Sequence, residues 1–337
     1  MYQTPLNSIK SLQVLLSPLN WGLGHVSRTI PIIQKLIHQN NEVLICCDQE
    51  QETFYRHYFP QLQYIFHQGY PFQFKGKGNW TLDLLSNFNT LHRRLITEKQ
   101  EVQRLVDTFQ PDLIISDQRY GFISKQVKSV IISHQLKLPL PTWNFLPQIW
   151  NQKLLTDFDE IWIPDIENHL LSGDLSKKKM KNIHFLGFCS RFSSFFEQNK
   201  EKAESSSPIY KYLGVISGPS PYKEQFFELL CQKLIKTDQN SAIIVPKGVN
   251  VDLFKESKKL TFFISPNVHQ FSELLLQSEK IISRAGYSTL MDLTVLKKEA
   301  ILIPTPRQFE QIYLAKLHKN NKMWTFLSEK DWKVTEL

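Results

Sequence analysis

The feature that most constrains the fold is the alternation of short, continuously apolar runs with helix-like segments along most of the chain. The runs are rich in Val, Ile and Leu and do not alternate apolar with polar residues. This pattern is typical of strands that are buried on both faces of a parallel sheet. The predicted strands are Gln13–Leu19, Glu42–Cys47, Gln63–His67, Asp112–Ser116, Val130–Ser133, Glu160–Pro164, His184–Phe188, Tyr212–Ser217, Ala242–Pro246, Thr261–Ile264, Lys280–Ser283 and Ala300–Pro304.

One polar, serine-rich stretch, Ser193–Pro208, interrupts this alternation, which then restarts. A length of 337 residues suits two α/β domains better than one large core. We therefore expect a first domain over residues 1–192, a linker over 193–208 and a second domain over 209–322. In such doubly wound sheets ligands bind beyond the carboxyl ends of the strands, so polar residues that follow strands are the candidates for function.

The composition is that of a globular protein, with 42% hydrophobic and 21% charged residues. No apolar run reaches the ~18 residues that a membrane span needs, and the first residues lack the features of a signal peptide. A cytoplasmic location is the resulting expectation. The cysteines show no CxxC spacing and are expected to be buried free thiols rather than disulfides or metal ligands: Cys46, Cys47, Cys189 and Cys231.

The formal net charge of +8 indicates an anionic partner: nucleic acid, an acidic membrane surface or a phosphorylated small molecule. Charge alone does not choose among them. The stretch Tyr70–Trp80 mixes aromatic residues, lysines and glycines. Such a loop would either rest on an anionic headgroup layer or cover a bound substrate without touching lipid, and the sequence leaves both readings open.

The segment Asn20–Arg28 directly follows the first predicted strand and opens a helix. Gly22 and Gly24 permit a tight turn, and His25 would lie in the first helical turn at the carboxyl edge of the sheet. A neutral imidazole there could accept a proton from a substrate hydroxyl as a general base. The alternative is that His25 only caps or packs the turn, and both readings stay open.

Three further motifs follow strands of the second domain. Ser217 and Gly218 form a turn before a helix, and Ser283–Gly286 leads from a strand into a helix that contains Asp292. Backbone N–H groups at such turns bind phosphates, and a carboxylate in the following helix can accept two vicinal hydroxyls. Glu310 and Gln311 follow the next strand and suit the hydroxyls of a sugar, whereas neighbouring Gln308 is expected to cap its helix.

In the first domain, Asp117 and His134 lie where strands end and are candidates for contact with an acceptor. Asp117 could equally be a satisfied loop carboxylate.

Four segments together resemble glycosyltransferase family 28, of the GT-B fold: GLGHVSR, SGPSP, SRAGYSTLMD and PTPRQFEQIYLA. The resemblance implies two Rossmann-like domains with mainly parallel sheets facing across a cleft, and a C-terminal segment, 323–337, that packs back on the N-terminal domain. It also implies a nucleotide-sugar donor, most often UDP-linked. By this resemblance Asp292 holds the ribose, Glu310 and Gln311 hold the donor sugar, and His25 faces the acceptor as the base. The residues implied to line the diphosphate pocket are Ser217, Gly218, Ser283, Arg284, Ala285 and Gly286.

The sequence departs from the family pattern at Asp292, where Glu is usual, and at Pro219 and Pro221, where small polar residues are usual. The resulting prediction is an inverting, metal-independent glycosyltransferase without a cofactor, because no Asp-x-Asp follows a strand to carry a divalent ion. The acceptor is unidentified. The resemblance to the family implies a lipid or cell-envelope acceptor at the inner face of the membrane. Two rivals remain: a non-transferring GT-B enzyme such as a UDP-sugar 2-epimerase, and a basic protein that binds nucleic acid or an anionic surface without chemistry. Of these partners, nucleic acid is not expected.

Overall fold

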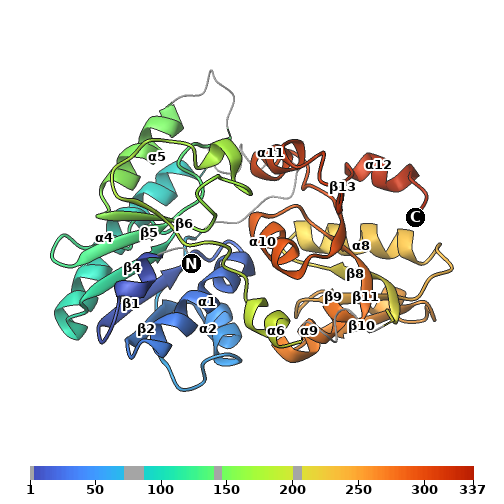
Figure 1. Cartoon of the computed structure of the whole chain (residues 1–337), viewed down its shortest axis with the longest axis horizontal. Coiled ribbons are helices and arrows are strands. Elements are labelled where there is room, and N and C mark those ends of the chain that lie inside the picture. Colours follow the sequence, from blue (N-terminus) through green and yellow to red (C-terminus); the bar gives the residue numbers. More distant parts are fainter. Residues whose placement is uncertain (1–3, 72–86, 140–145, 200–206) are drawn as a thin grey trace. The chain divides into compact units, whose positions relative to one another are not determined.

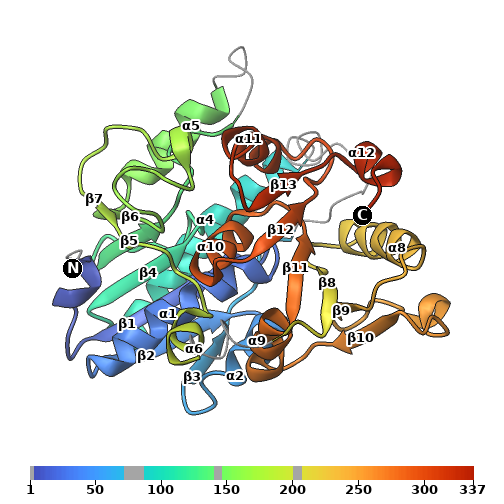
Figure 2. The same cartoon turned by 45° about the vertical axis from the view of Figure 1, so that its right-hand side comes forward.

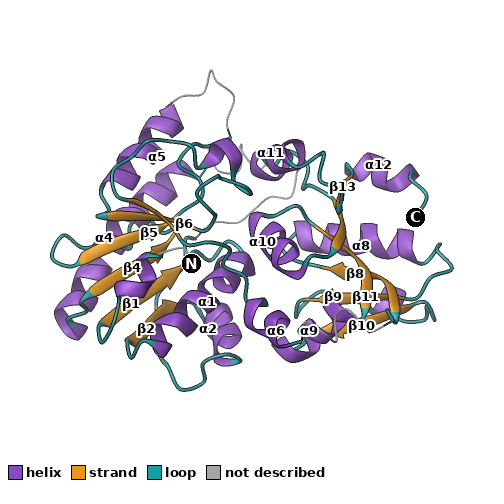
Figure 3. Ribbon diagram, in the orientation of Figure 1, coloured by secondary structure: helices purple, strands orange, loops and turns teal. Residues whose placement is uncertain are grey.

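The computed structural model describes residues 4–71, 87–139, 146–199 and 207–337 (Figure 1). The described residues form two compact units, one ending at Arg191 and the other beginning at Phe192. Each unit is an α/β layer structure built on one parallel sheet, as the ribbon coloured by secondary structure shows (Figure 3). The predicted architecture of two doubly wound domains is therefore confirmed.

The first unit carries a seven-stranded parallel sheet of order β3-β2-β1-β4-β5-β6-β7 within the described residues. Its strands are β1 (Gln13–Pro18), β2 (Glu42–Cys47), β3 (Gln63–Phe66), β4 (Leu113–Asp117), β5 (Lys128–Ile132), β6 (Glu160–Ile163) and β7 (Ile183–Phe185). Its helices are α1 (Leu23–His38), α2 (Gln49–Arg56), α4 (Phe88–Phe109) and α5 (Leu146–Thr156), with short 3-10 turns at Pro5–Ser8 and Gly173–Leu175.

The core of this unit lies on both faces of the central strands. Every residue of β4 is buried, and β1 is buried from Val14 to Pro18. Val102 and Val106 of α4 pack with Leu15 and Ile114 on one face. Right-handed crossovers place α1 and α2 on the other face, where these two helices contact each other. Burial on both faces explains why the strands read as continuous apolar runs.

The second unit carries a six-stranded parallel sheet of order β10-β9-β8-β11-β12-β13 within the described residues. Its strands are β8 (Tyr210–Val215), β9 (Ser241–Val245), β10 (Leu260–Ile264), β11 (Ser278–Ser283), β12 (Glu299–Leu302) and β13 (Trp324–Phe326). Its helices are α6 (Ser193–Gln198), α8 (Tyr222–Leu234), α9 (Val268–Leu276), α10 (Tyr287–Leu296), α11 (Phe309–Leu317) and α12 (Glu329–Val334), with a 3-10 turn at Asp252–Phe254.

Helices α8 and α10 lie on opposite sides of this second sheet (Figure 2). Phe226 and Leu230 of α8 are fully buried in a cluster that also contains Ile243 of β9 and Ile282 of β11. All strands predicted from the sequence are present within a few residues of the expected bounds, whereas β13 was not predicted.

The predicted linker is only partly correct. Its first residues form α6, which contacts α10 and belongs to the second unit. The rings of Phe192 and Phe271 lie 5.3 Å apart, and those of Phe195 and His269 lie 5.9 Å apart. These aromatic side chains anchor a stretch whose polar composition had suggested a loop. Residues 200–206 of the predicted linker lie outside the described residues.

The C-terminal segment, which was expected to pack back on the first domain, belongs to the second unit. Strand β13 pairs with β12 and so extends the second sheet. The side chain of Trp332 is fully buried in the core of the second unit, and its Nε1 donates to the carbonyl oxygen of Leu229 at 3.3 Å. The large ring of Trp332 is buried against α8, so the C-terminal segment completes the core of the second unit.

All four cysteines are buried free thiols, as predicted. Within the described ranges, none of the helices combines the length and the hydrophobicity required to cross a bilayer. Of the aromatic and basic stretch Tyr70–Trp80, only Tyr70 and Pro71 belong to the described residues.

Candidate active site

The first half of the candidate site is the turn between β1 and α1. Gly22 is the N-cap of α1 and has a φ of +108°, a conformation that favours glycine over residues with a side chain. Gly24 and His25 follow within the first helical turn. The side chain of His25 is 19% exposed, which leaves it reachable from solvent at the carboxyl edge of the sheet.

Asp117 approaches His25 from the end of β4. Strands β1 and β4 are paired, and the chain winds outward in opposite directions from them, so the two residues lie at the switch point of the sheet. The Asp117 carboxylate is fully buried, and its Oδ2 lies 3.0 Å from His25 Nδ1. Crevices at such switch points are where open α/β sheets bind ligands.

Arg28 completes the cluster and was given no role from the sequence. It lies one turn after His25 on the same face of α1, and its side chain is only 2% exposed. Its Nε lies 3.0 Å from each oxygen of Asp117, and its Nη1 lies 3.4 Å from Nδ1 of His134. The spacing of three residues between His25 and Arg28 was the signal available in the sequence.

The charges of this cluster favour a neutral imidazole. Burial lowers the pKa of His25, and the neighbouring Arg28 lowers it further, against an opposing effect of Asp117. Burial alone would raise the pKa of Asp117, but Arg28 and His25 hold that pKa below its usual value. Asp117 is therefore a carboxylate and His25 is uncharged at neutral pH. An Nδ1–H that donates to Asp117 would leave a lone pair on Nε2, the arrangement of a general base.

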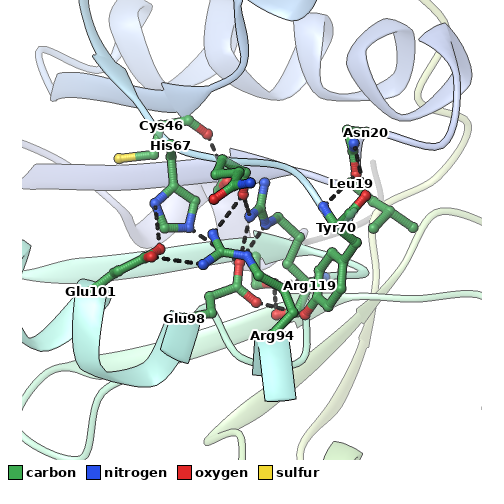
Figure 4. Close-up of polar contacts among 12 residues, drawn as sticks. Leu19, Asn20, Cys46, His67, Tyr70, Arg94, Glu98, Glu101 and Arg119 are labelled. Atoms are coloured by element: carbon green, nitrogen blue, oxygen red, sulfur yellow. Dashed lines mark hydrogen bonds and ion pairs between the residues drawn. The ribbon is translucent and has the colours of Figure 1, made fainter. Parts of the chain in front are cut away.

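A second buried polar cluster supports the loops that carry these residues (Figure 4). The side chains of Glu98 and Arg119 are both fully buried and are joined by an Arg119 Nε to Glu98 Oε1 hydrogen bond of 2.6 Å. Tyr70 donates its hydroxyl to Glu98 Oε2 at 2.6 Å, and His67 Nε2 lies 3.2 Å from Oε1. The backbone N–H of Tyr70 in turn donates to the side chain of Asn20 at 3.0 Å.

This cluster, formed by Glu98, Arg119, Tyr70 and His67, links two loops of the first half-site. Asn20 precedes the His25 turn, and Arg119 lies two residues after Asp117. The Arg119 guanidinium also donates to the carbonyl oxygen of Gln68 at 2.7 Å. No motif in the sequence indicated this cluster.

In the second unit, the predicted donor residues follow three adjacent strands. The sheet register pairs Val215 of β8 with Ser283 of β11, and Ser283 with Leu302 of β12. The turns after β8, β11 and β12 therefore emerge side by side at one edge of the sheet, around the switch point between β8 and β11. The structure thus brings the segments of all three predicted donor motifs to the same edge.

The turn after β8 contains Ser217 and Gly218. Gly218 has a φ of +104° and is exposed, and a Cβ there would meet nothing within 4 Å. Its conformation therefore requires glycine, while the space around it is open. Ser220 donates its hydroxyl to Glu224 at 2.7 Å at the start of α8.

The turn after β11 leads into α10 with Gly286 as the N-cap, a residue without a side chain that could cap the helix. Neither the φ of Gly286 nor crowding requires a glycine, since a Cβ would meet only Thr289 Oγ1 at 3.8 Å. The N-terminus of a helix presents N–H groups to an anion. Ser283 and Ala285 are buried, and Asp292 is half-buried in the second turn of α10.

The side chain of Arg284, predicted to line the diphosphate pocket, contacts other groups of its own unit. It is 5% exposed, its Nη2 lies 2.8 Å from Glu329 of α12, and its guanidinium stacks 4.2 Å from the ring centre of Phe226. It also donates to the carbonyl oxygens of Ile303 and Pro304 at 3.3 and 3.4 Å. The guanidinium is turned into the unit, where it holds α12 and the turn after β12.

The turn after β12 leads into α11. Gln308 is the N-cap and accepts from the backbone N–H of Gln311, as expected for a capping residue. The side-chain oxygen of Gln311 accepts from the backbone N–H of Thr305 at 2.8 Å. That oxygen therefore fixes the turn, which leaves the amide nitrogen of Gln311 as the group to offer a sugar. Glu310 is half-buried in the first turn of α11.

Comparison with known proteins shows which family the second unit resembles. Residues 227–337 match the model of the glycosyltransferase family 28 C-terminal domain. The UDP-N-acetylglucosamine--N-acetylmuramyl-(pentapeptide) pyrophosphoryl-undecaprenol N-acetylglucosamine transferase 1 of Bacillus cereus is 27% identical over 237 residues. This match covers 66% of the chain and 61% of the relative's length.

Solved structures support the same fold over nearly the whole chain. The glycotransferase of kitacinnamycin superposes with a TM-score of 0.65 at 10% identity, covering 95% of this chain and 86% of that one. Arabidopsis thaliana UGT89C1, complexed with UDP-L-rhamnose, gives a TM-score of 0.64 at 12% identity with the same coverage. The family match, the curated relative and these folds together support a chain that is similar to glycosyltransferase family 28 and has the GT-B fold.

Proposed function

We propose that the chain transfers a sugar from a nucleotide sugar to an acceptor hydroxyl, with inversion at the sugar and without a metal ion. The observation that carries the proposal is the His25–Asp117 pair at the switch point of the first sheet. A buried carboxylate next to a neutral, partly exposed imidazole is the arrangement of a general base. The family 28 domain that follows in the chain supports a nucleotide-sugar donor.

The donor is proposed to bind at the three adjacent turns of the second unit. The N–H groups at the start of α10 and in the turn of Ser217 and Gly218 would hold the diphosphate, with Ser283, Ala285 and Gly286 lining it. Asp292 would accept the ribose hydroxyls, and Glu310 and Gln311 would bind the donor sugar. The relative from Bacillus cereus has UDP-N-acetylglucosamine in its name, so UDP is the nucleotide we propose.

The proposed reaction is a single displacement. His25 Nε2 takes the proton of the acceptor hydroxyl while its oxygen forms a bond to the anomeric carbon. The bond from that carbon to the diphosphate oxygen breaks on the opposite face, which inverts the configuration. The negative charge that develops on the diphosphate is stabilised by the α10 N-terminus, whose dipole and N–H groups favour anions.

The acceptor is proposed to be lipid-linked. The relative's name specifies a pyrophosphoryl-undecaprenol acceptor, and the net charge of +8 suits an anionic membrane surface. We therefore propose that the protein acts at the cytoplasmic face of a membrane by peripheral contact. Co-sedimentation with vesicles should then increase with their anionic lipid content. Co-sedimentation that does not depend on the anionic lipid content would contradict the proposed membrane contact.

The test of the transfer reaction is the release of free UDP from a UDP-sugar with and without acceptor. We expect UDP to appear at a substantial rate only when a lipid-linked acceptor fraction is added, together with a glycosylated lipid product. A non-transferring enzyme such as a UDP-sugar 2-epimerase would instead convert the UDP-sugar without any acceptor. That outcome would replace the transferase proposal.

Asp292→Ala tests the donor site separately. Removing the carboxylate should weaken UDP binding by roughly 1–3 kcal/mol, because the ribose hydroxyls would lose their acceptor. Isothermal titration calorimetry measures this difference directly, and Asp252→Ala, which removes an exposed carboxylate of the same unit, is the matched control. Equal UDP affinity in the Asp292→Ala and control variants would show that the ribose lies elsewhere.

A further inference from the structure

Arg28 is the charged residue of the first half-site that the transfer chemistry leaves without a task. A guanidinium that is 2% exposed carries a desolvation cost, so its position needs a compensating set of partners. It stands on α1 one helical turn after His25, and it reaches toward the same carboxylate. The role of Arg28 therefore depends on its effect on Asp117 and His25.

The carboxylate of Asp117 contacts both Arg28 and His25. Arg28 Nη2 donates to Asp117 Oδ1, and its Nε lies 3.0 Å from both oxygens. The planar fork thus fixes the orientation of the carboxylate, as two parallel N–H donors do. The same orientation brings Oδ2 to 3.0 Å from Nδ1 of His25.

This geometry discriminates between the two neutral forms of the imidazole. With the proton on Nδ1, His25 donates to Asp117 Oδ2 and Nε2 has a lone pair. With the proton on Nε2, the lone pair of Nδ1 would accept from Arg28 Nη2 at 2.9 Å but would also face the carboxylate oxygen of Asp117 at 3.0 Å. Arg28 Nη2 also donates to Asp117 Oδ1, and the negative carboxylate repels a lone pair while the first form gives it a donor, so the first form is favoured.

We propose that Arg28 is a positioning residue that holds Asp117 in the orientation which keeps His25 an uncharged base with its lone pair on Nε2. The proposal rests on the proposed role of His25 as the base. Arg28 touches neither the acceptor nor the donor in this account. It acts through Asp117, and it balances the buried negative charge that would otherwise favour a protonated imidazole.

The groups that face this cluster make the electrostatic consequence specific. Asp117, Arg28 and His134 face His25, while Tyr55 of α2 and Cys189 face Asp117. Burial raises the pKa of Tyr55, and it raises that of Cys189 to about 12, so both are neutral near pH 7. Removal of the Arg28 charge would leave the Asp117 carboxylate unbalanced beside His25. The pKa of His25 would then rise, because the Coulombic effect of Arg28 lowers it and that of Asp117 raises it.

The test is a titration of His25 followed by nitrogen-15 NMR in Arg28→Met and Arg28→Lys, with the resonance assigned by its loss in His25→Gln. In Arg28→Met we expect the pKa of His25 to rise by about 1–3 units, the range over which one neighbouring charge moves the pKa of a titrating group. The acidic limb of turnover should move to higher pH by the same amount. Lys35→Met removes a positive charge from the same helix two turns further along and should leave the titration of His25 unchanged.

Arg28→Lys keeps the charge but loses the planar fork, and it decides the question if Arg28→Met does not fold. We expect the share of the Nδ1–H form to fall and turnover to drop, with the pKa of His25 staying near that of the unmodified protein. Unchanged titration and unchanged tautomer shares in the folded variants would overturn the proposal. The titration needs no substrate, so the predicted shift without any sugar transfer would defeat only the proposed function. Normal transfer with an unshifted His25 would defeat only the inference about Arg28.

Discussion

Glu98→Ala is expected to lower the free energy of unfolding by about 3–5 kcal/mol, the range for removing one partner of a buried ion pair. Glu98 and Arg119 are both fully buried, and Glu98 also accepts from Tyr70 and lies within hydrogen-bond distance of His67. Without the carboxylate, the guanidinium of Arg119 stays buried with its charge unbalanced. Chemical denaturation monitored by far-ultraviolet circular dichroism measures the loss.

The control for this variant is Asp107→Ala, which removes an exposed carboxylate of the same helix. It should change the free energy of unfolding by less than about 1 kcal/mol. A Glu98→Ala variant that is as stable as this control would show that the buried cluster contributes little to the fold.

The same cluster predicts a specific acid sensitivity. Burial alone would raise the pKa of Glu98, but Arg119 and the hydrogen bonds from His67 and Tyr70 lower it to about 2, from 4.5. A carboxyl group whose pKa is lowered in the folded state stabilises the protein above pH 4.5, and this contribution is lost as the pH falls toward 2. The stability of Glu98→Gln should therefore depend less steeply on pH in that interval than the stability of the unmodified protein.

His25→Ala is expected to reduce turnover by roughly 10²–10⁴-fold, the contribution of a positioned general base. Nucleotide affinity should change little, because the proposed donor residues lie in the other unit. The melting temperature should also change little, since His25 is partly exposed and its loss leaves Arg28 paired with Asp117. Steady-state kinetics, calorimetry with UDP and thermal unfolding on one preparation separate these three quantities.

His38→Ala is the matched control, because it removes an exposed histidine at the end of the same helix. If His25 only packs the turn, its loss would lower stability while activity per folded molecule stayed the same. Full turnover in a well-folded His25→Ala variant would remove this residue from the mechanism.

The fold was predictable from the sequence wherever an element is buried on both faces. Strands β1, β4 and β9 each contain a continuous apolar run, because helices cover both sides of their sheets. Strand β13 was not predicted, because a strand of three residues at the edge of its sheet is too short to show a hydrophobic pattern. Helix α6 was not predicted for a different reason. Its local composition is polar, and it is held by tertiary contacts with α10 and α9 that a local sequence pattern does not reveal.

The sequence predicted the individual turns of the candidate site but not the side-chain contacts that join them. Glycines and polar residues after strands indicated the turns of His25, Gly218 and Gly286. The contact between His25 and Asp117 joins residues 92 positions apart, and sheet pairing, which single-sequence patterns do not specify, creates it. Arg284 shows the converse: a residue at the right place in a motif has its side chain turned inward because Glu329 and two carbonyl oxygens accept its donors.

The most direct test of the central claim, that the chain uses a nucleotide sugar, is its thermal unfolding in the presence of UDP, UDP-sugars, other nucleoside diphosphates and RNA. The account predicts that UDP or a UDP-sugar at 100 times its dissociation constant adds about 2.7 kcal/mol to the free energy of unfolding. This increase should be smaller in Asp292→Ala at the same ligand concentration and unchanged in His25→Ala. The contradicting result would be no stabilisation by any nucleotide or sugar nucleotide, together with RNA binding that weakens steeply as salt increases.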